Sequence, residues 1–329
     1  MDACTAGKKN APVASRSTFD KTKTNGSDYS TGTRNHTLDF ALAIEASGLG
    51  SPSIIPDGDL HRFRVEGDRA GSRNGWYSLH LDGTPAGIFG SWKTSETHTW
   101  CATSRDEMTP ADRARVRAIV DKARATREAE AKDRHQAAAL KAQAMWSAAS
   151  SADQAHQYLS TKGIQPHGIR QQGIALLVPV VVGGKLASIQ SIYPDGQKRF
   201  LPGGRISGGY YFVKSRVTRP EILICEGFAT GATLHQETGS ACYVAFNAGN
   251  LIHVARHARS RHLDADIIVC ADNDRWTAGN PGLTKAKAAA IEIGARLLVP
   301  DFSGMDLSGK PTDWNDWYAL RRHGAEVAA

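Results

Sequence analysis

Two aspartates separated by one residue follow an apolar segment in the last third of the chain. The segment DIIVCADNDRW runs from Asp266 to Trp276, and Asp272 and Asp274 come where its buried strand should end. Alternate side chains of an extended segment point the same way, so the two carboxylates would repel each other. A bound cation would remove this repulsion. The spacing therefore predicts a cation-binding site.

Further acidic residues follow other strand-like segments. Glu226 comes after EILIC, and Asp313 and Asp316 lie in PTDWNDW after the last apolar segment. One acidic residue alone is often only a helix cap. Several at the carboxyl ends of strands, where open parallel sheets bind ligands, favour a functional site. Clustered carboxylates raise one another's pKa unless a cation offsets them, and oxygen ligands suit Mg²⁺ or Mn²⁺.

The elements that carry these residues read as a parallel sheet. EILICE, ACYVAFNA, ADIIVCAD and ARLLVP are nearly continuous apolar segments, each followed by a helical segment. Strands of this kind are buried on both faces. We therefore predict an α/β domain over residues 221–329, with a parallel sheet and flanking helices.

The preceding residues, 151–220, read as an antiparallel meander. The stretch from Ile174 to Val213 is punctuated by Gly183-Gly184, by Pro194-Asp195-Gly196 and by two further Gly-Gly pairs. We predict a β-rich subdomain here. Its basic residues are candidates for binding nucleotide or template, namely Lys185, Lys198, Arg199 and Arg205.

The first half of the chain divides into three parts. Residues 1–35 are polar and read as a disordered tail, residues 36–104 as a small α+β module, and residues 105–150 as a charged helical linker that buries little. The module is rich in aromatic residues. Packing on one face of a small sheet is the favoured interpretation, and base stacking by Trp76, Trp92 and Trp100 is the alternative.

Composition limits the class of protein. The chain has 329 residues with a net charge of +7, which suits a nucleic-acid partner without proving one. The longest apolar run, Ile174–Val182, contains Pro179 and is too short to span a bilayer. No signal peptide is evident, and the five cysteines form no C-x-x-C pair. We therefore expect a cytoplasmic protein with no membrane partner.

Four motifs carry a resemblance to a known family. EGFATGATLH, AFNAGNL, ADNDRWTAGNPGLTKA and PTDWND occur in this order. They resemble the Toprim domain of primases encoded by plasmids, conjugative elements and phages. The upstream β-rich stretch is similar to the segment before Toprim in such primases, and to the basic subdomain of bacterial DnaG-type primases. The similarity runs from about His156 to Ala319.

The resemblance implies a role for each matching residue. Glu226 would be a metal ligand or a general acid/base, and Asp272 and Asp274 would bind the divalent metal. Asp313 and Asp316 fall at the third acidic motif, where the match is looser. Lys198 and Arg199 match basic positions thought to contact nucleotide phosphates or template.

The function expected from the resemblance is synthesis of short primers on single-stranded DNA from nucleoside triphosphates. A replicative helicase or a plasmid or phage replication protein is a further candidate partner. A Toprim-type nuclease and a non-catalytic single-strand-binding accessory protein are the alternatives.

The sequence predicts no zinc site. The zinc ribbon usual in the family has no counterpart, and His61, His80, His98 and Cys101 lack ligand spacing. His253 and His257 are four residues apart, but the glutamate of H-E-x-x-H is missing, so a helix surface is the better interpretation.

Overall fold

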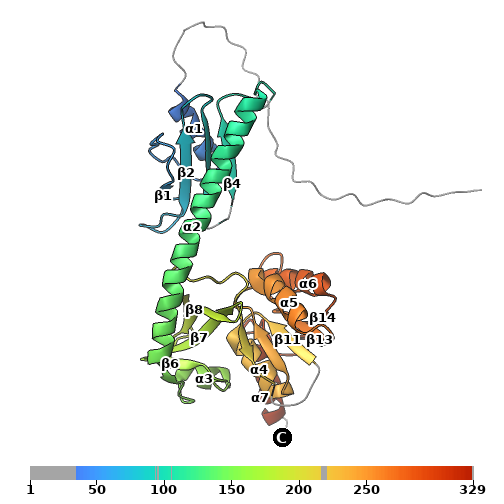
Figure 1. Ribbon diagram of the computed structural model, residues 1–329. Helices are drawn as coiled ribbons and strands as arrows, with labels where there is room; N and C mark the ends of the chain where they lie inside the picture. The colour runs from blue at the N-terminus through green and yellow to red at the C-terminus, as the bar shows by residue number, and fades with distance from the viewer. Residues whose placement is uncertain (1–34, 93, 95, 105, 216–220, 328–329) are drawn as a thin grey trace, which may run out of the picture. The chain divides into compact units, whose positions relative to one another are not determined.

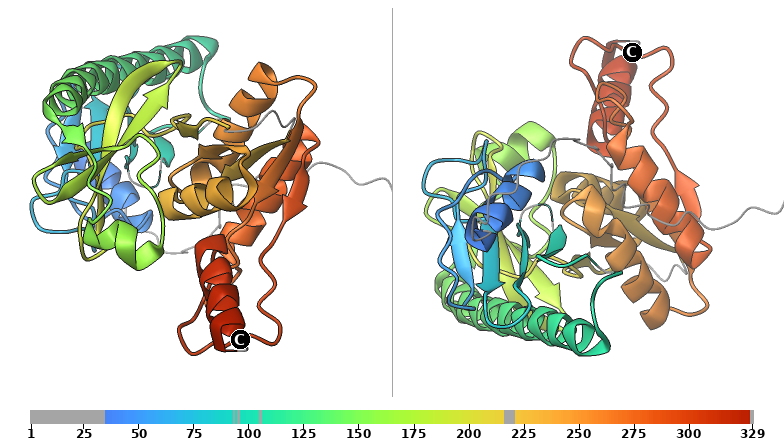
Figure 2. Two further views of the ribbon diagram at one scale, coloured as in Figure 1. Left: turned by 90° about the horizontal axis from the view of Figure 1, so that it is seen from below. Right: turned by 90° about the horizontal axis from the view of Figure 1, so that it is seen from above.

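The computed structural model describes residues 35–92, 94, 96–104, 106–215 and 221–327. The tail predicted over residues 1–35 thus lies, except for its last residue, outside the described residues. The chain forms two compact units, Met1–Ala123 and Arg124–Ala329. The division falls inside one long helix, α2 (Pro110–Ala148), which is continuous in every view (Figure 1 and Figure 2).

The first unit contains an antiparallel sheet and a short helix. The helix is α1 (His36–Ala46), and the strands are β1 (His61–Phe63), β2 (Gly75–His80), β3 (Ala86–Ser91) and β4 (Thr97–Cys101). They pair in the order β1-β2-β3-β4. The α+β architecture predicted for residues 36–104 is therefore confirmed.

Both faces of this sheet are covered. On one face, Phe40 and Ile44 of α1 pack against Tyr77, Leu79 and Phe89. On the other, Trp76 and Ile88 pack against Ala123 of α2, with Val120 beside them. Adjacent strand residues point to opposite faces, which separates Trp76 from Tyr77. The beginning of α2 is thus part of the module.

The end of α2 belongs to the second unit. Ala142 packs against Leu177 and Ile189, and Ala138 is also buried. The helix was expected to be a solvated linker, and the structure differs. Alanines let a helix approach a sheet closely but give a weak apolar stripe in the sequence, so the pattern hid this contact. Each end of α2 is a packing element of its own unit.

The second unit begins with an antiparallel sheet and one short helix. Its strands pair in the order β5-β6-β7-β8-β9, and α3 lies between the first two in sequence. The elements are β5 (Ser150–Ser151), α3 (Gln157–Lys162), β6 (Arg170–Gln172), β7 (Ala175–Val182), β8 (Lys185–Ile192) and β9 (Lys198–Phe200). Gly183 and Gly184 have φ of 56° and 78° and form the tight turn between β7 and β8, as predicted.

The final strand of the expected meander lies elsewhere. β10 (Tyr211–Val213) pairs antiparallel with β12 of the next sheet rather than continuing from β9. One isolated bridge, between Val181 and Tyr210, still joins this segment to the first sheet. The prediction of one meander through YYFV was therefore wrong at its last strand, because a short apolar strand can pair with either neighbour.

The second sheet is parallel apart from β10. Its order is β10-β12-β11-β13-β14, with four flanking α-helices and one short 3-10 helix. The strands are β11 (Glu221–Cys225), β12 (Ala241–Val244), β13 (Asp266–Cys270) and β14 (Arg296–Leu298). The helices are α4 (Phe228–Thr238), η1 (Ala248–Asn250), α5 (Leu251–Arg261), α6 (Pro281–Ile293) and α7 (Trp314–Val327). The α/β fold predicted for residues 221–329 is confirmed.

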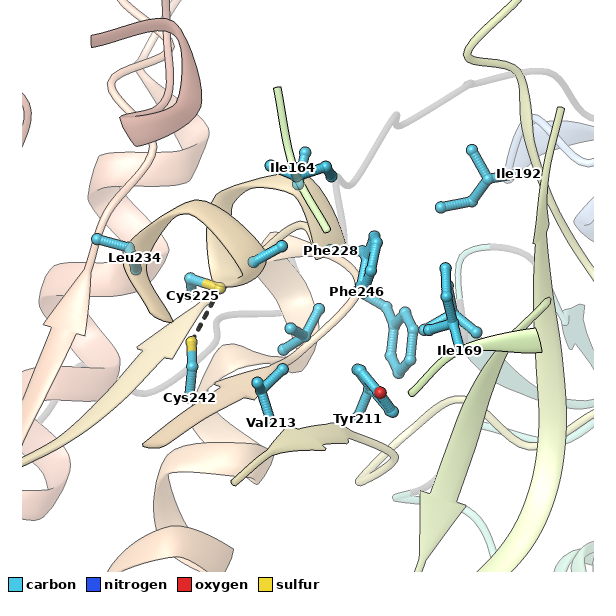
Figure 3. Close-up of a cluster of buried hydrophobic side chains, with 14 of the residues drawn as sticks. Ile164, Ile169, Ile192, Tyr211, Val213, Cys225, Phe228, Leu234, Cys242 and Phe246 are labelled. Carbon is cyan, nitrogen blue, oxygen red and sulfur yellow. Dashed lines mark hydrogen bonds between the residues drawn. The ribbon is translucent and has the colours of Figure 1, made fainter. Parts of the chain in front are cut away.

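The two faces of the parallel sheet have different partners. Ile224 and Val269 face α5 and α6, whereas Cys225 and Cys270 face α4. The α4 side also holds residues from the antiparallel subdomain, including Ile164, Ile169 and Ile192 (Figure 3). The two subdomains therefore share one hydrophobic core and fold as one unit.

The cysteines of the strands are buried thiols. Cys225 and Cys242 lie on neighbouring strands with their sulfur atoms 3.6 Å apart (Figure 3). Burial raises the thiol pKa of Cys225 and Cys270, so both are held in the neutral form. Among the described helices, none is long and apolar enough to cross a bilayer.

Candidate active site

Three acidic segments meet at the carboxyl ends of the parallel strands. Glu226 directly follows β11, and Asp272 comes two residues after β13, its neighbour in the sheet. Asp313 immediately precedes α7, and Thr230 of α4 donates a 3.3 Å hydrogen bond to its Oδ2. Electrostatic coupling of Asp272 to Glu226, Asp274 and Asp313 shows that the structure gathers all four carboxyls.

Asp272 is the most strongly perturbed of these carboxyls. Burial, and then the charges of Asp313, Glu226 and Asp274, raise its pKa to about 8, while Lys198 acts in the opposite direction. Its Oδ1 is buried and makes no hydrogen bond within the described part of the chain. A buried acceptor without a donor is costly. A proton or a cation must therefore satisfy it.

Two further carboxyls show the same tendency. Burial raises the pKa of Glu226, helped by Asp274, while a backbone hydrogen bond from Ala248 and the charge of Lys198 lower it. Burial and Asp316 raise the pKa of Asp313. Groups with such shifts concentrate at functional sites.

Asp274 is fixed by the helix that follows it. Its Oδ2 accepts a 2.9 Å hydrogen bond from the amide of Gly282, in the first turn of α6. A Cβ on Gly282 would lie 2.7 Å from that oxygen and 2.9 Å from the carbonyl oxygen of Asp272. Only glycine leaves room for both aspartates here.

The segment between the aspartates is also fixed. The amide of Asn273 donates to the carbonyl of Thr312 (2.7 Å), and its side-chain oxygen accepts from Asn280 (2.9 Å). The first bond ties the Asp272–Asp274 segment to the loop that leads into Asp313, and the second ties it to the start of α6. Sequence reasoning missed this role, although an asparagine between two aspartates was a visible signal.

The carboxylates of Asp313 and Asp316 also accept hydrogen bonds from backbone amides. Oδ1 of Asp313 accepts the amide of Asp316 (2.9 Å), which caps α7, and Oδ2 of Asp316 accepts the amide of Thr312 (3.0 Å). The Nζ of Lys162 lies 3.4 Å from Oδ1 of Asp316. Lys162 was not predicted, because 154 residues separate it from Asp316.

The basic residues predicted to bind nucleotide or template have different surroundings. Lys198 of β9 lies close enough to lower the pKa of Glu226 and of Asp272. A Cβ on Gly227 would be 4.0 Å from its Nζ. Arg199, the next residue of the strand, lies over the ring of Tyr193 at 5.7 Å. Arg205 lies near His135 of α2, whose pKa it helps to lower, and Lys185 is exposed beside the β7–β8 turn.

The aromatic candidates of the first unit differ in exposure. Trp76 is 1% exposed in the core, so its ring is not available for stacking on a base, as the favoured packing interpretation predicted. Trp92 and Trp100 are half-buried: Arg62 lies over Trp92 at 5.6 Å, and Trp100 packs edge-on against Phe40. For these two, template stacking stays a prediction.

The donors at the site suit a hard divalent cation. Oδ1 of Asp272 is buried and unpartnered, and the charges of Asp313, Glu226 and Asp274 act on this carboxyl. Among the described residues, no three His, Cys, Asp or Glu side chains lie close enough together to form a complete metal site by themselves. Mg²⁺ commonly uses one or two carboxylates and completes its shell with water and substrate phosphates. The residues therefore fit such an ion.

The comparison with known families decides what the C-terminal domain is. Residues 221–326 match the Toprim domain family. This region is a Toprim domain. The resemblance seen in the four motifs is thus confirmed, and Toprim domains in general bind divalent metals.

The similarity to curated proteins extends beyond the Toprim domain. The chain is 32% identical over 280 residues to a DNA primase TraC of Escherichia coli, covering 80% of this chain and 26% of that protein. A second DNA primase TraC of Escherichia coli is 32% identical over 282 residues, covering 80% of this chain and 19% of that protein. The chain thus spans about a quarter of the length of the first relative and about a fifth of the length of the second.

Proposed function

We propose that this chain makes short primers on single-stranded DNA by metal-dependent nucleotidyl transfer. The observation that carries the proposal is the carboxyl cluster around Asp272, in a Toprim domain whose relatives are named DNA primases. Nucleoside triphosphates and a single-stranded DNA template are the proposed substrates. A replicative helicase or another replication protein of a plasmid or phage is the proposed partner, and the cytoplasm is the proposed place of action.

The carboxyls would hold the cofactor. The proposed ligands of Mg²⁺ or Mn²⁺ are Glu226, Asp272, Asp274, Asp313 and Asp316, and no zinc is expected. When bound, such an ion would lower the pKa of the attacking 3'-hydroxyl and neutralise charge that develops on the triphosphate.

The remaining residues would orient the reactants. Glu226, whose pKa is raised by burial, is the proposed general acid or base. Lys198 of β9 approaches Glu226 and Asp272, and it would bind the triphosphate. Asn273 and Gly282 hold the aspartates in place.

The half-buried Trp92 and Trp100 leave a template-binding role open for the 36–104 module. We propose this role as a second function within the chain. In the antiparallel subdomain, the proposed contacts to nucleotide or template besides Lys198 are Lys185, Arg199 and Arg205.

One experiment separates the proposed function from the two alternatives. The protein is incubated with circular single-stranded DNA, labelled NTPs or dNTPs, and Mg²⁺ or Mn²⁺, and the products are resolved on a gel. Labelled oligonucleotides that need template and metal support the primase. Cleavage of the DNA without nucleotides would indicate the nuclease. Binding of the DNA without either product would indicate the accessory protein.

A further inference from the structure

A tryptophan next to the acidic site is exposed. Trp276 comes two residues after Asp274, and its side chain is 46% accessible to solvent. Ten large hydrophobic residues are exposed in the part of the chain whose burial the structure describes, and Trp276 is the aromatic residue among them. A single exposed apolar side chain is common on protein surfaces, so the surroundings of Trp276 have to show whether its ring has a role.

The ring is nevertheless held in place. Its Nε1 donates a 3.2 Å hydrogen bond to the carbonyl of Pro311, in the segment that leads to Asp313. The guanidinium of Arg275 lies 5.4 Å from the ring centroid, in the range of a cation–π contact. The indole is therefore fixed at its polar edge while much of its surface stays open.

The loop that carries Trp276 is closed by hydrogen bonds. The amide of Thr277 donates to the carbonyl of Asp274 (2.8 Å), and the amide of Asn280 donates to the carbonyl of Thr277 (3.0 Å). The side-chain bond between Asn280 and Asn273 joins the two ends of the loop. A ring on such a support loses little entropy when a ligand stacks on it.

Rigid aromatic rings beside arginine are typical of sites that stack nucleobases. We propose that Trp276, flanked by Arg275, is the stacking platform for a nucleobase whose phosphates lie at the carboxyl cluster. The base belongs either to a nucleoside triphosphate or to single-stranded DNA. This inference rests on the proposed function for its ligand class, but it concerns binding and not synthesis.

Base-dependent binding is the test. Affinities of the wild-type chain, Trp276→Ala and Trp276→Phe are measured, with Mg²⁺ present, for ATP and for a short single-stranded DNA. Each ligand has a probe without bases: inorganic tripolyphosphate for ATP, and an oligomer of abasic nucleotides for the DNA. Trp276→Ala should weaken binding about 5- to 100-fold for the ligand that stacks. Trp276→Phe should stay within about threefold of wild type, because it keeps a stacking ring.

The base-free probes decide between stacking and general damage. Binding of tripolyphosphate and of the abasic oligomer should be unchanged by Trp276→Ala. A loss limited to ATP assigns the base to the nucleotide, and a loss limited to the DNA oligomer assigns it to the strand. The stacking proposal would be refuted if Trp276→Ala weakened binding equally for ligands with and without bases. It would also be refuted if the affinity for neither ATP nor the DNA oligomer fell.

A fluorescence measurement covers the case in which Trp276→Ala does not fold. Stacking on the indole should quench its emission, so a saturating ligand should quench wild type more than Trp276→Phe at similar affinity. Equal quenching in both proteins would overturn the proposal. If the wild-type chain binds bases through Trp276 but makes no primers, the proposed primase function is refuted. The stacking role of Trp276 is still supported in that case.

Discussion

The amide of Gly282 lies 2.9 Å from Oδ2 of Asp274, and the α-carbon that bears this amide has no room for a side chain. A methyl group at this position would sit 2.7 Å from the carboxylate oxygen. The first turn of α6 thus sets the position of Asp274, and through it the spacing of the two aspartates.

Gly282→Ala should therefore disturb the site more than the fold. The methyl group must displace Asp274 or the start of α6, and misplacing a reacting group by about 1 Å can reduce a rate about 100-fold. Primer synthesis measured with the variant should fall by at least tenfold. Gly309→Ala is the matched control, since nothing lies within 4 Å of its added Cβ and Gly309 is exposed. Equal activity of both variants would refute this packing argument.

Without a metal, the stability of the chain should fall as the pH rises from about 4 to about 8. The pKa of Asp272 is about 8 when folded and near its ordinary value of 3.8 when unfolded, so between these values the folded state binds more protons. Stability then decreases with pH. The raised pKa values of Glu226 and Asp313 act in the same direction.

Asp272→Asn should flatten this pH dependence and stabilise the metal-free chain at pH 8 by up to about 5 kcal/mol, since each unit between 3.8 and about 8 corresponds to about 1.4 kcal/mol. Thermal unfolding in EDTA across this pH range measures it. Added Mg²⁺ should stabilise wild type and much less so the variant. A variant with the wild-type pH slope would show that Asp272 is not the buried acid.

Lys198→Ala and Arg199→Ala should differ although both remove one positive charge. Lys198 approaches the carboxyls, whereas Arg199 lies over Tyr193. A lost charge-assisted contact is worth about 1.5–3 kcal/mol, so Lys198→Ala should weaken triphosphate binding about 10- to 100-fold. Arg199→Ala should weaken it less than about threefold. Similar losses in ATP binding, measured by calorimetry, would contradict this division of the strand.

A fragment that starts at Ser150 should be less stable than one that starts at Arg124. The shorter fragment lacks Ala142 and leaves Leu177 and Ile189 exposed. Burial of each such side chain contributes about 1.5–3 kcal/mol, so the two fragments should differ by several degrees in Tm. Equal midpoints in thermal unfolding would show that the second half of α2 is the solvated linker that its charges suggest.

The sequence was informative where local patterns decide the structure. The apolar strands β11 to β14 and the acidic residues at their ends were predictable, because burial on both faces leaves a continuous apolar segment. The carboxyl cluster followed from the rule that parallel strands place their carboxyl ends at one edge.

Features that depend on tertiary partners were not predictable. β10 is a three-residue strand that pairs with β12 rather than with β9, and no local signal chooses between them. Lys162 meets Asp316 only because α3 packs beside α7's first turn. The exposed ring of Trp276 became notable only when its fixed surroundings were known.

The most direct test of the account is template-dependent primer synthesis by three proteins: wild type, Asp272→Asn and the exposed control Asp264→Asn. Each is incubated with circular single-stranded DNA, labelled NTPs and Mg²⁺ or Mn²⁺, with and without EDTA. We predict oligonucleotide products for wild type and for Asp264→Asn, none for Asp272→Asn, and none for any protein in EDTA. Wild-type levels of product from Asp272→Asn, or product in excess EDTA, would contradict the assignment of metal-dependent nucleotidyl transfer to this carboxyl cluster.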